Sequence, residues 1–224
     1  MKSVILISAD AEWLAIRQIL PQVKIRATAL GETFLTRMRS ARVRFYHGGW
    51  GRISAAATAQ YVLDHYHPDL LINLGTCGGF AGRIQRGTIL LVEKTAVYDI
   101  LEQMTDPQSA IDAYTTTLDL SWLVDALPHP VQRGLLVSGD RDLLPEDIPI
   151  LTEKYGAVAA DWESGAIAWV AQRNRVRCLI LRGVTDLVGP NGGEAYGNLE
   201  LFQSRTREVM QTLIGQLPDW LELG

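Results

Sequence analysis

Three carboxylates and one arginine are the residues of this chain whose types and positions best suit chemistry. Glu12 and Glu163 each follow an apolar stretch, and Asp186 follows a third. Arg182 lies four residues before Asp186. Such groups suit cleavage of a glycosidic bond, in which one acid protonates the leaving group and a second carboxylate activates water. The loops that hold them contain no serine elbow, cysteine–histidine pair or metal-ligand cluster that would favour other chemistry.

Each carboxylate taken alone also has a simpler structural interpretation. Glu12 and Glu163 suit the positive ends of helix dipoles. Asp161 is placed to cap a helix, and Asp186 can begin a turn. The local pattern favours this interpretation, so a functional one depends on whether the fold brings the groups together.

The segment over residues 155–188 is expected to position most of these groups. We predict in turn a short strand, a helix and a buried strand, over residues 157–160, 161–173 and 176–184. Glu163 starts an apolar row on the helix, which directs its carboxylate towards the interior. Arg182 and Asp186 are expected to point the same way, because strand side chains repeat every two residues.

Other motifs also follow predicted strands. Buried strands are predicted over residues 4–8, 69–74, 88–92 and 134–138. A glycine turn at Gly75–Gly79 and a turn at Ser138–Asp142 follow two of them, and the backbone N–H groups of the glycine turn suit an anion or ribose hydroxyls. Open α/β sheets bind ligands at the carboxyl ends of their strands. These loops therefore share one rim wherever the strands run parallel.

The remaining segments complete a single domain over residues 1–224. Alternating polar and apolar residues predict antiparallel hairpins over 25–47, and residues 106–117 are expected to be irregular. Further helices are predicted over residues 10–20, 54–65, 121–126, 145–155 and 199–217. Residues 188–198 contain too many Gly, Pro and Asn for regular structure, which predicts a mobile flap.

Length, charge and composition narrow the class of protein. The chain has 224 residues, enough for one large α/β domain. Its formal net charge of −4 gives no reason to expect nucleic acid or an anionic membrane as a partner. No apolar run approaches the roughly 18–20 residues that cross a bilayer, and the N-terminus does not fit a signal peptide. Because two cysteines and four scattered histidines support neither disulfides nor a metal site, we expect a cytoplasmic protein without metal or cofactor.

Several segments resemble the nucleoside phosphorylase/nucleosidase superfamily. They are INLGTCGG, GGWGRISAAATAQYVLDHYHPD, GLLVSGD, ADWESGAIAWVA and LRGVTD. The likeness runs from Val4 to the C-terminal helix and is nearest to the methylthioadenosine/S-adenosylhomocysteine nucleosidase branch. It implies a three-layer αβα sandwich around a central mixed, partly barrel-like sheet. It also implies a purine nucleoside as ligand and a homodimer in which one subunit completes the other's pocket.

The resemblance implies a role for each catalytic candidate. Asp186 resembles the general acid that supplies a proton to purine N7 as the C–N bond breaks. Glu12 resembles the carboxylate that holds and deprotonates the attacking water, assisted by Arg182 and Thr76. Glu163 matches the residue that binds the ribose hydroxyls. A free Asp has a pKa near ~3.9, so Asp186 must be desolvated or hydrogen-bonded in its neutral form to act near pH 7.

The resemblance also implies a substrate-binding set. The backbone of Leu143 reads the base edge, and Trp50 and Tyr196 line the pocket for the 5′ substituent. Gly78 belongs to the glycine segment whose backbone approaches the ligand. Trp162 takes the place of a methionine that packs against the sugar.

Three departures alter this specificity set and leave the catalytic set intact. Asp142 stands where these nucleosidases carry an aromatic that stacks on the base, and Ala9 replaces a bulkier apolar residue. Trp162 is larger than methionine. The departures affect the identity of the nucleoside more than the reaction.

Three functions fit these residues. The first is hydrolysis of a purine nucleoside such as methylthioadenosine, adenosylhomocysteine or a related 5′-modified nucleoside; the second is phosphorolysis by a phosphorylase of the same fold. Phosphorolysis is disfavoured because Asn73 stands where those phosphorylases carry an arginine, and Asp10 and Glu12 would repel phosphate. Arg52 and Arg182 are the obvious cations nearby. The third, a nucleoside sensor without catalysis, has little need for both an acid and a base.

Overall fold

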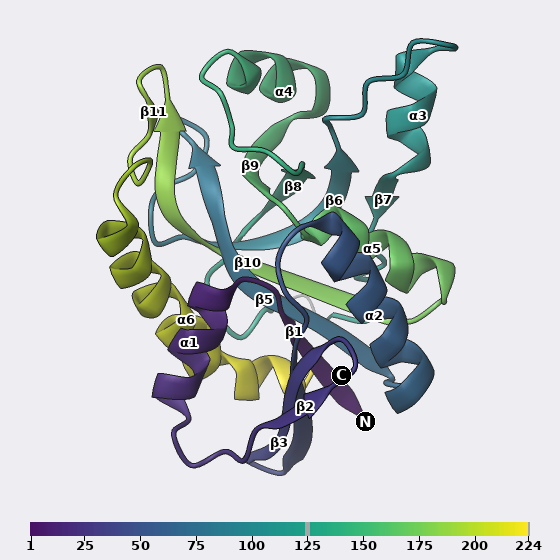
Figure 1. Ribbon diagram of the computed structural model, residues 1–224, viewed down its shortest axis with the longest axis vertical. Helices are drawn as coiled ribbons and strands as arrows, with labels where there is room; N and C mark the ends of the chain where they lie inside the picture. Colours follow the sequence, from purple (N-terminus) through teal and green to yellow (C-terminus); the bar gives the residue numbers. More distant parts are fainter. Residues whose placement is uncertain (124–125, 224) are drawn as a thin grey trace.

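The computed structural model describes residues 1–123 and 126–223 (Figure 1). Its strands are β1 (Ser3–Ile7), β2 (Arg26–Thr28), β3 (Gly31–Met38), β4 (Ala41–His47), β5 (Leu70–Phe80), β6 (Ile89–Val97), β7 (Thr115–Thr117), β8 (Gln132–Ser138), β9 (Ala157–Asp161), β10 (Arg177–Gly189) and β11 (Gly192–Gly193). Its helices are α1 (Asp10–Ile19), α2 (Arg52–Tyr66), α3 (Pro107–Ala113), α4 (Asp147–Tyr155), α5 (Ser164–Arg173) and α6 (Leu199–Leu221). The mixture of strands and helices along the chain is that of an α/β fold.

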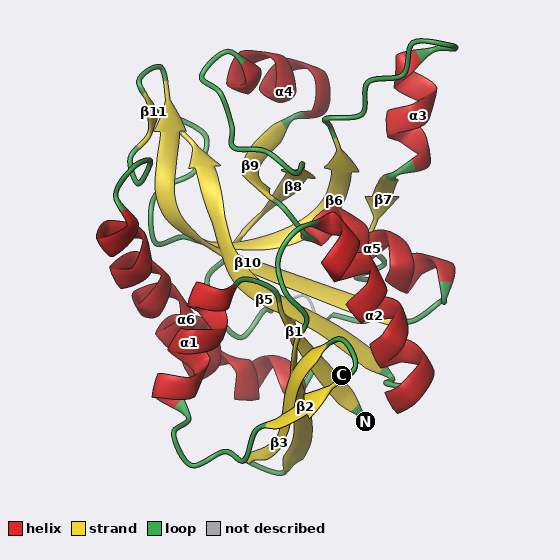
Figure 2. Ribbon diagram, in the orientation of Figure 1, coloured by secondary structure: helices red, strands yellow, loops and turns green. Residues whose placement is uncertain are grey.

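One mixed sheet contains the described strands and closes partly on itself (Figure 2). β4, β1, β5 and β10 run parallel to one another. β10 also pairs antiparallel with β6, and the sheet continues through β8 and β9 back to β5. The strands β5, β10, β6, β8 and β9 therefore form a closed barrel. The β2–β3–β4 hairpins, predicted from the alternation over 25–47, extend the other edge.

Helices cover both faces of the open part of the sheet. α1 and α6 pack on one face, and α2 and α5 pack on the other (Figure 2). In β1, Ile5 and Ile7 join the core beneath α1 and α6. Val4 and Leu6 join the core beneath α2 and α5. Since strand side chains alternate between faces, a strand that is apolar on both requires a helical layer on each. The predicted three-layer αβα sandwich with a partly barrel-like sheet is confirmed.

β5 does not turn at its glycines. The sequence predicted a turn over Gly75–Gly79, but the strand continues to Phe80. A Cβ atom added at Gly75 would lie 2.0 Å from Arg182 Nη1 and 2.6 Å from Glu12 Oε1. Gly75 is therefore required for the close approach of charged side chains to the strand rather than for a bend.

β10 is longer than predicted and contains an irregularity. It runs to Gly189, so Asp186 lies inside the strand rather than past its end. A β-bulge between Val184 and Asp186 shifts the register of β10 against β5. Because a bulge adds one residue to the strand, the simple alternation expected from Arg182 to Asp186 does not hold across it.

Three other predictions need correction. Helix α5 begins at Ser164, which makes Glu163 its N-cap residue and leaves Asp161 at the end of β9. The segment over 106–117, predicted to be irregular, forms α3 and β7. No helix covers the described part of 121–126, and residues 124–125 of that prediction lie outside the described residues.

The C-terminal part of the chain is more regular than expected. Val188 and Gly189 pair with the short strand β11, so the segment predicted as a flap begins as a hairpin. Helix α6 continues past its predicted end at residue 217 to Leu221 and includes Pro218 in its last turn. Within residues 1–123 and 126–223, no helix is both long and apolar enough to cross a membrane.

Candidate active site

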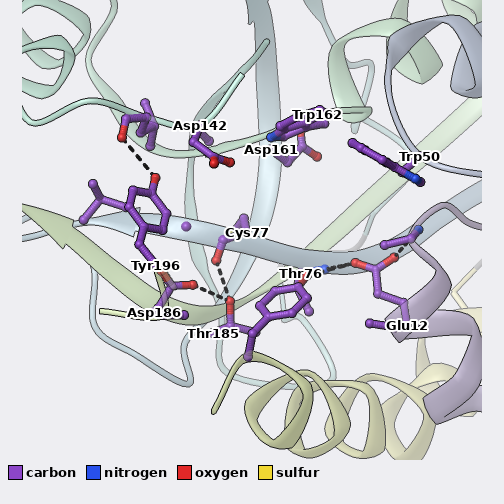
Figure 3. A pocket seen from close by; sticks show the side chains of 18 of the residues that line it. Glu12, Trp50, Thr76, Cys77, Asp142, Asp161, Trp162, Thr185, Asp186 and Tyr196 are labelled. Atoms are coloured by element: carbon purple, nitrogen blue, oxygen red, sulfur yellow. Dashed lines mark hydrogen bonds between the residues drawn. The ribbon is translucent and has the colours of Figure 1, made fainter. Parts of the chain in front are cut away.

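A cavity of about 870 Å³ lies where β5, β10 and the start of α5 meet the loops that follow β1, β8 and β11 (Figure 3). Most of the site residues predicted from the sequence line it: Glu12, Trp50, Thr76, Gly78, Leu143, Trp162, Glu163, Asp186 and Tyr196. Arg182, the remaining one, is fully buried behind this lining. We expected the loops to share one rim only if their strands run parallel, and the strands involved are not all parallel. Closure of the barrel nevertheless places β9 beside β5 and β8 beside β9, which unites the loops.

Arg182 is the centre of a buried charged cluster. Its Nε donates to Ser164 Oγ at 2.9 Å, and its Nη2 donates to Asn73 Oδ1 at 2.7 Å. Nη2 also lies 2.9 Å from Asp161 Oδ2, and Glu12 and Glu163 carboxylate oxygens lie 3.7 Å from the guanidinium. A buried arginine is tolerated where carboxylates and hydrogen bonds compensate its desolvation, as they do here.

Glu12 extends from the first turn of α1 towards this cluster. Its Oε1 accepts hydrogen bonds from the backbone N–H of Thr76 at 2.6 Å and from Thr76 Oγ1 at 2.9 Å. Its Oε2 accepts a hydrogen bond from the backbone N–H of Ala9 at 3.2 Å. The carboxylate is 1% exposed, yet donors, the helix N-terminus and Arg182 all stabilise its negative charge. These contacts hold the carboxylate in a fixed position at the edge of the cavity.

Asp161 also lines the cavity, although we expected it only as a helix cap. Its carboxylate does accept from the backbone N–H of Ser164 at 3.2 Å, and it also pairs with Arg182. Ser138 Oγ donates to it at 2.6 Å. The signal that could have revealed it is a buried acid at a strand end opposite a buried arginine. Asp161 therefore fixes both the start of α5 and the position of the guanidinium.

Glu163 lies at the N-terminus of α5 and bridges the cluster and the cavity. Its Oε1 accepts from the backbone N–H of Gly51 at 3.0 Å. Burial raises the pKa of Glu163 to about 8, although Arg182 favours the ionised form and lowers it. Burial therefore favours the protonated form of this side chain.

Asp186 occupies another part of the cavity lining (Figure 3). Burial raises its pKa, while a hydrogen bond from Thr185 Oγ1 at 2.8 Å and the backbone N–H of Ala195 act in the opposite direction. Among the described residues, no ion pair joins Asp186 to a cation. We expected Arg182, Glu163 and Asp186 to lie together. The structure pairs Arg182 with Glu163 and separates Asp186, which lies beyond the bulge at Thr185.

The aromatic residues occupy two ends of the cavity. The rings of Trp50 and Trp162 lie 5.0 Å apart at one end. At the other end, Tyr196 Oη donates to the carbonyl oxygen of Leu143 at 3.0 Å, with Asp142 nearby (Figure 3). Trp50 and Tyr196, which the resemblance assigned to one subsite, thus lie apart in this structure.

A model of the phosphorylase superfamily matches residues 4–217. The chain belongs to this superfamily. The match covers the whole cavity lining, so the site described above is part of the family's domain rather than an addition to it. The recognition based on the sequence segments is confirmed.

Relatives with known names are distant in sequence but similar in length and fold. The 5′-methylthioadenosine/S-adenosylhomocysteine nucleosidase of Tolumonas auensis is 24% identical over 232 residues, covering 97% of this chain and 100% of the relative. The enzyme of the same name from Buchnera aphidicola is 24% identical over 198 residues, covering 83% and 85%. The structure of the Streptococcus pneumoniae nucleosidase in complex with 8-aminoadenine superposes with a TM-score of 0.78 at 20% identity and covers both chains completely. The structural likeness establishes a shared fold.

Proposed function

We propose that this protein hydrolyses the N-glycosidic bond of a purine nucleoside, releasing the base and the sugar. The observation that carries the proposal is the presence of two buried carboxylates, Glu12 and Asp186, in one cavity but in different surroundings. Glu12 is surrounded by groups that stabilise a negative charge. Burial raises the pKa of Asp186, against the hydrogen bonds from Thr185 and Ala195, and thus favours the neutral acid.

In the proposed reaction, the two groups act on opposite sides of the bond that breaks. Asp186, protonated, donates to the purine and makes it a better leaving group. Glu12 orients a water molecule and accepts its proton as the water attacks the sugar, while Thr76 and Arg182 hold the carboxylate in place. Glu163 binds ribose hydroxyls, and its neutral form near pH 7 can both donate and accept hydrogen bonds.

Water is favoured over phosphate as the nucleophile because the nearby cations are already engaged. Arg182 is fully buried and directs its nitrogens at protein acceptors. Arg52 forms a bidentate pair with Asp99, at 2.5 and 2.8 Å. Within the described lining of the cavity, Arg141 is the one cation, and it pairs with Asp147 at 2.7 Å. A phosphate dianion requires fixed cations that are not already paired with protein acceptors.

Asn73 supports the same choice. It stands at the position where the resemblance expects an arginine in the phosphorylases. Its amide nitrogen donates to the carbonyl oxygen of Leu6 at 3.1 Å, and its amide oxygen accepts from Arg182. Both ends of the amide therefore take part in internal bonds, and its side chain is fully buried.

The proposed substrates are methylthioadenosine, adenosylhomocysteine or a related 5′-modified nucleoside, by analogy with the named relatives. The end of the cavity that holds Trp50 and Trp162 suits an apolar 5′ substituent.

The proposal includes a homodimer. Ile53, Leu101 and Met104 are at least 85% exposed, and their burial against a second subunit would be favourable.

A panel of nucleosides incubated with and without phosphate tests the proposal. We expect release of free base and free sugar at a rate that does not depend on phosphate. A sugar-1-phosphate product, or a rate that rises with phosphate, would favour the phosphorylase. Tight binding without any turnover would favour a sensor. Adenosine and methylthioadenosine differ only at the 5′ position. The ratio of their kcat/KM values therefore measures how much the Trp50 and Trp162 end of the cavity contributes to recognition of the 5′ substituent.

A further inference from the structure

Glu194 and its partners Arg205, Arg86 and Leu187 form a clamp beside Asp186 that has no role in the proposed reaction. Glu194 lies just after β11. Its Oε2 accepts from Arg205 of α6 at 2.9 Å, from Arg86 at 3.4 Å and from the backbone N–H of Leu187 at 3.3 Å. Its own backbone N–H donates to the carbonyl oxygen of Leu187 at 3.1 Å. One side chain thus connects β10, the segment before β6 and α6.

The clamp holds both chain segments that contact the Asp186 carboxylate. Leu187 is the next residue after Asp186, and two of the bonds of Glu194 go to its backbone. Ala195 is the next residue after Glu194, and its backbone N–H acts on the Asp186 carboxylate. A displacement of Glu194 would therefore move the acid and its backbone donor together.

We propose that Glu194 is a positioning residue for Asp186, and that with Arg205 it sets both the orientation and the charge environment of that acid. This inference rests on the proposed function, in which Asp186 is the proton donor. Glu194 connects its ion pairs with Arg205 and Arg86 to the buried Asp186. A change in these ion pairs would therefore alter the orientation and charge environment of Asp186 without changing a residue that lines the cavity.

The groups facing Asp186 act on it in different directions. Arg205 from α6 lowers the pKa of Asp186, and Glu194 raises it. Tyr196 from the loop after β11 and Cys77 from β5 are also close enough to interact with its charge, and burial raises the pKa of each. Removal of the Glu194 charge should therefore lower the pKa of Asp186, and removal of the Arg205 charge should raise it.

The experiment measures the titration of the Asp186 carboxyl carbon by ¹³C NMR in the full chain, with Asp186→Asn used to assign the signal. Glu194→Gln keeps the size and an acceptor oxygen but removes the charge, and we expect a lower pKa of Asp186. Arg205→Met is expected to raise it. Arg133→Met removes a comparable exposed ion pair with Glu93 and serves as the control that leaves the titration unchanged.

Kinetics give a second, independent measurement. The alkaline limb of kcat/KM reports the pKa of an acid that must be protonated, so it should move down in Glu194→Gln and up in Arg205→Met. Glu194→Ala, which removes the clamp, should lower kcat by up to about 10²-fold, and Glu194→Asp should restore part of it. A merely structural role would move both charge variants in the same direction, which would overturn the proposal, as would an unchanged titration. If the titrations shift as expected but no nucleoside is cleaved, the proposed function fails and the positioning role stands.

Discussion

Glu12 and Asp186 line the same cavity, but the protein surrounds the two carboxylates with different groups. Glu12 receives hydrogen bonds from Thr76 and Ala9 and lies 3.7 Å from Arg182. Asp186 receives a hydroxyl bond from Thr185, and the dominant influence on it is burial, which raises its pKa. One end of the cavity compensates a buried charge, whereas the other makes a buried charge costly.

In the proposed reaction, this difference lets one chain supply a base and an acid from the same functional group. Asp and Glu have nearly the same pKa in water, so the division of roles must come from the surroundings. The charge-stabilising end is built on β1, β5 and the start of α1. The desolvating end is built on β10 beyond its bulge and on the loop after β11. The following predictions test whether the two ends differ in this way.

The largest effect is expected for the acid. Asp186→Asn keeps the shape of the side chain but removes the proton, and general acid–base groups contribute typically about 10²–10⁴-fold. We expect kcat/KM to fall by that factor while the melting temperature changes little. Asp64→Asn, an exposed change on α2, is the matched control. Activity within a few-fold of the wild-type protein would remove Asp186 from the mechanism and end the comparison.

Glu12→Gln probes the other end. The amide can still accept from Thr76 but carries no charge and cannot take a proton from water. We expect turnover to fall by about 10²-fold or more, whereas nucleoside affinity measured by calorimetry should stay within a few-fold. Loss of binding together with turnover would mean that Glu12 contacts the ligand or supports the fold, and that it is not the base.

The smallest effect is expected for Glu163→Gln, and it is an effect on the pH dependence of stability. The folded-state pKa of Glu163, about 8, lies above the ordinary value of 4.5. The folded protein therefore holds a proton that the unfolded chain has released, and stability falls as pH rises between these values. Gln cannot titrate, so the variant should gain in melting temperature relative to wild type across this window. For a chain of this size, roughly 2–4 °C corresponds to each kcal/mol.

The control for this measurement is Glu153→Gln, at an exposed position of α4. Its difference from the wild-type protein should not depend on pH. If the Glu163→Gln difference is equally flat from pH 5 to 8, the Arg182 cluster holds Glu163 ionised and compensates its buried charge, contrary to the prediction.

Much of the cavity was predictable because its residues follow apolar strands, and such strands are recognisable one at a time. Glu12, Glu163 and Asp186 were found in this way. Asp161 was not recognised as a site residue, because its partner Arg182 lies on a different strand and the pair forms only in the folded chain. Local helix-capping chemistry was a sufficient explanation for Asp161 in the sequence alone.

The bulge and the long β5 strand could not be predicted for a related reason. A run of glycines fits a turn as well as a strand, and the side chains that cross above Gly75 decide between them. The bulge at Val184 and Asp186 depends on the register between β10 and β5. These are properties of contacts between distant segments, which local patterns do not contain.

Barrel closure has a consequence for the order in which the protein is made. β5 and β10 pair although they lie about a hundred residues apart in the chain, and contacts of such separation form slowly because a long loop must first be closed. During synthesis the ribosome exposes Glu12 and Thr76 long before β10 emerges. A partial chain that ends before β10 lacks Asp186 and cannot hold the two carboxylates around one cavity. In the proposed reaction, activity therefore depends on the completed barrel, and we expect products truncated before β10 to be inactive.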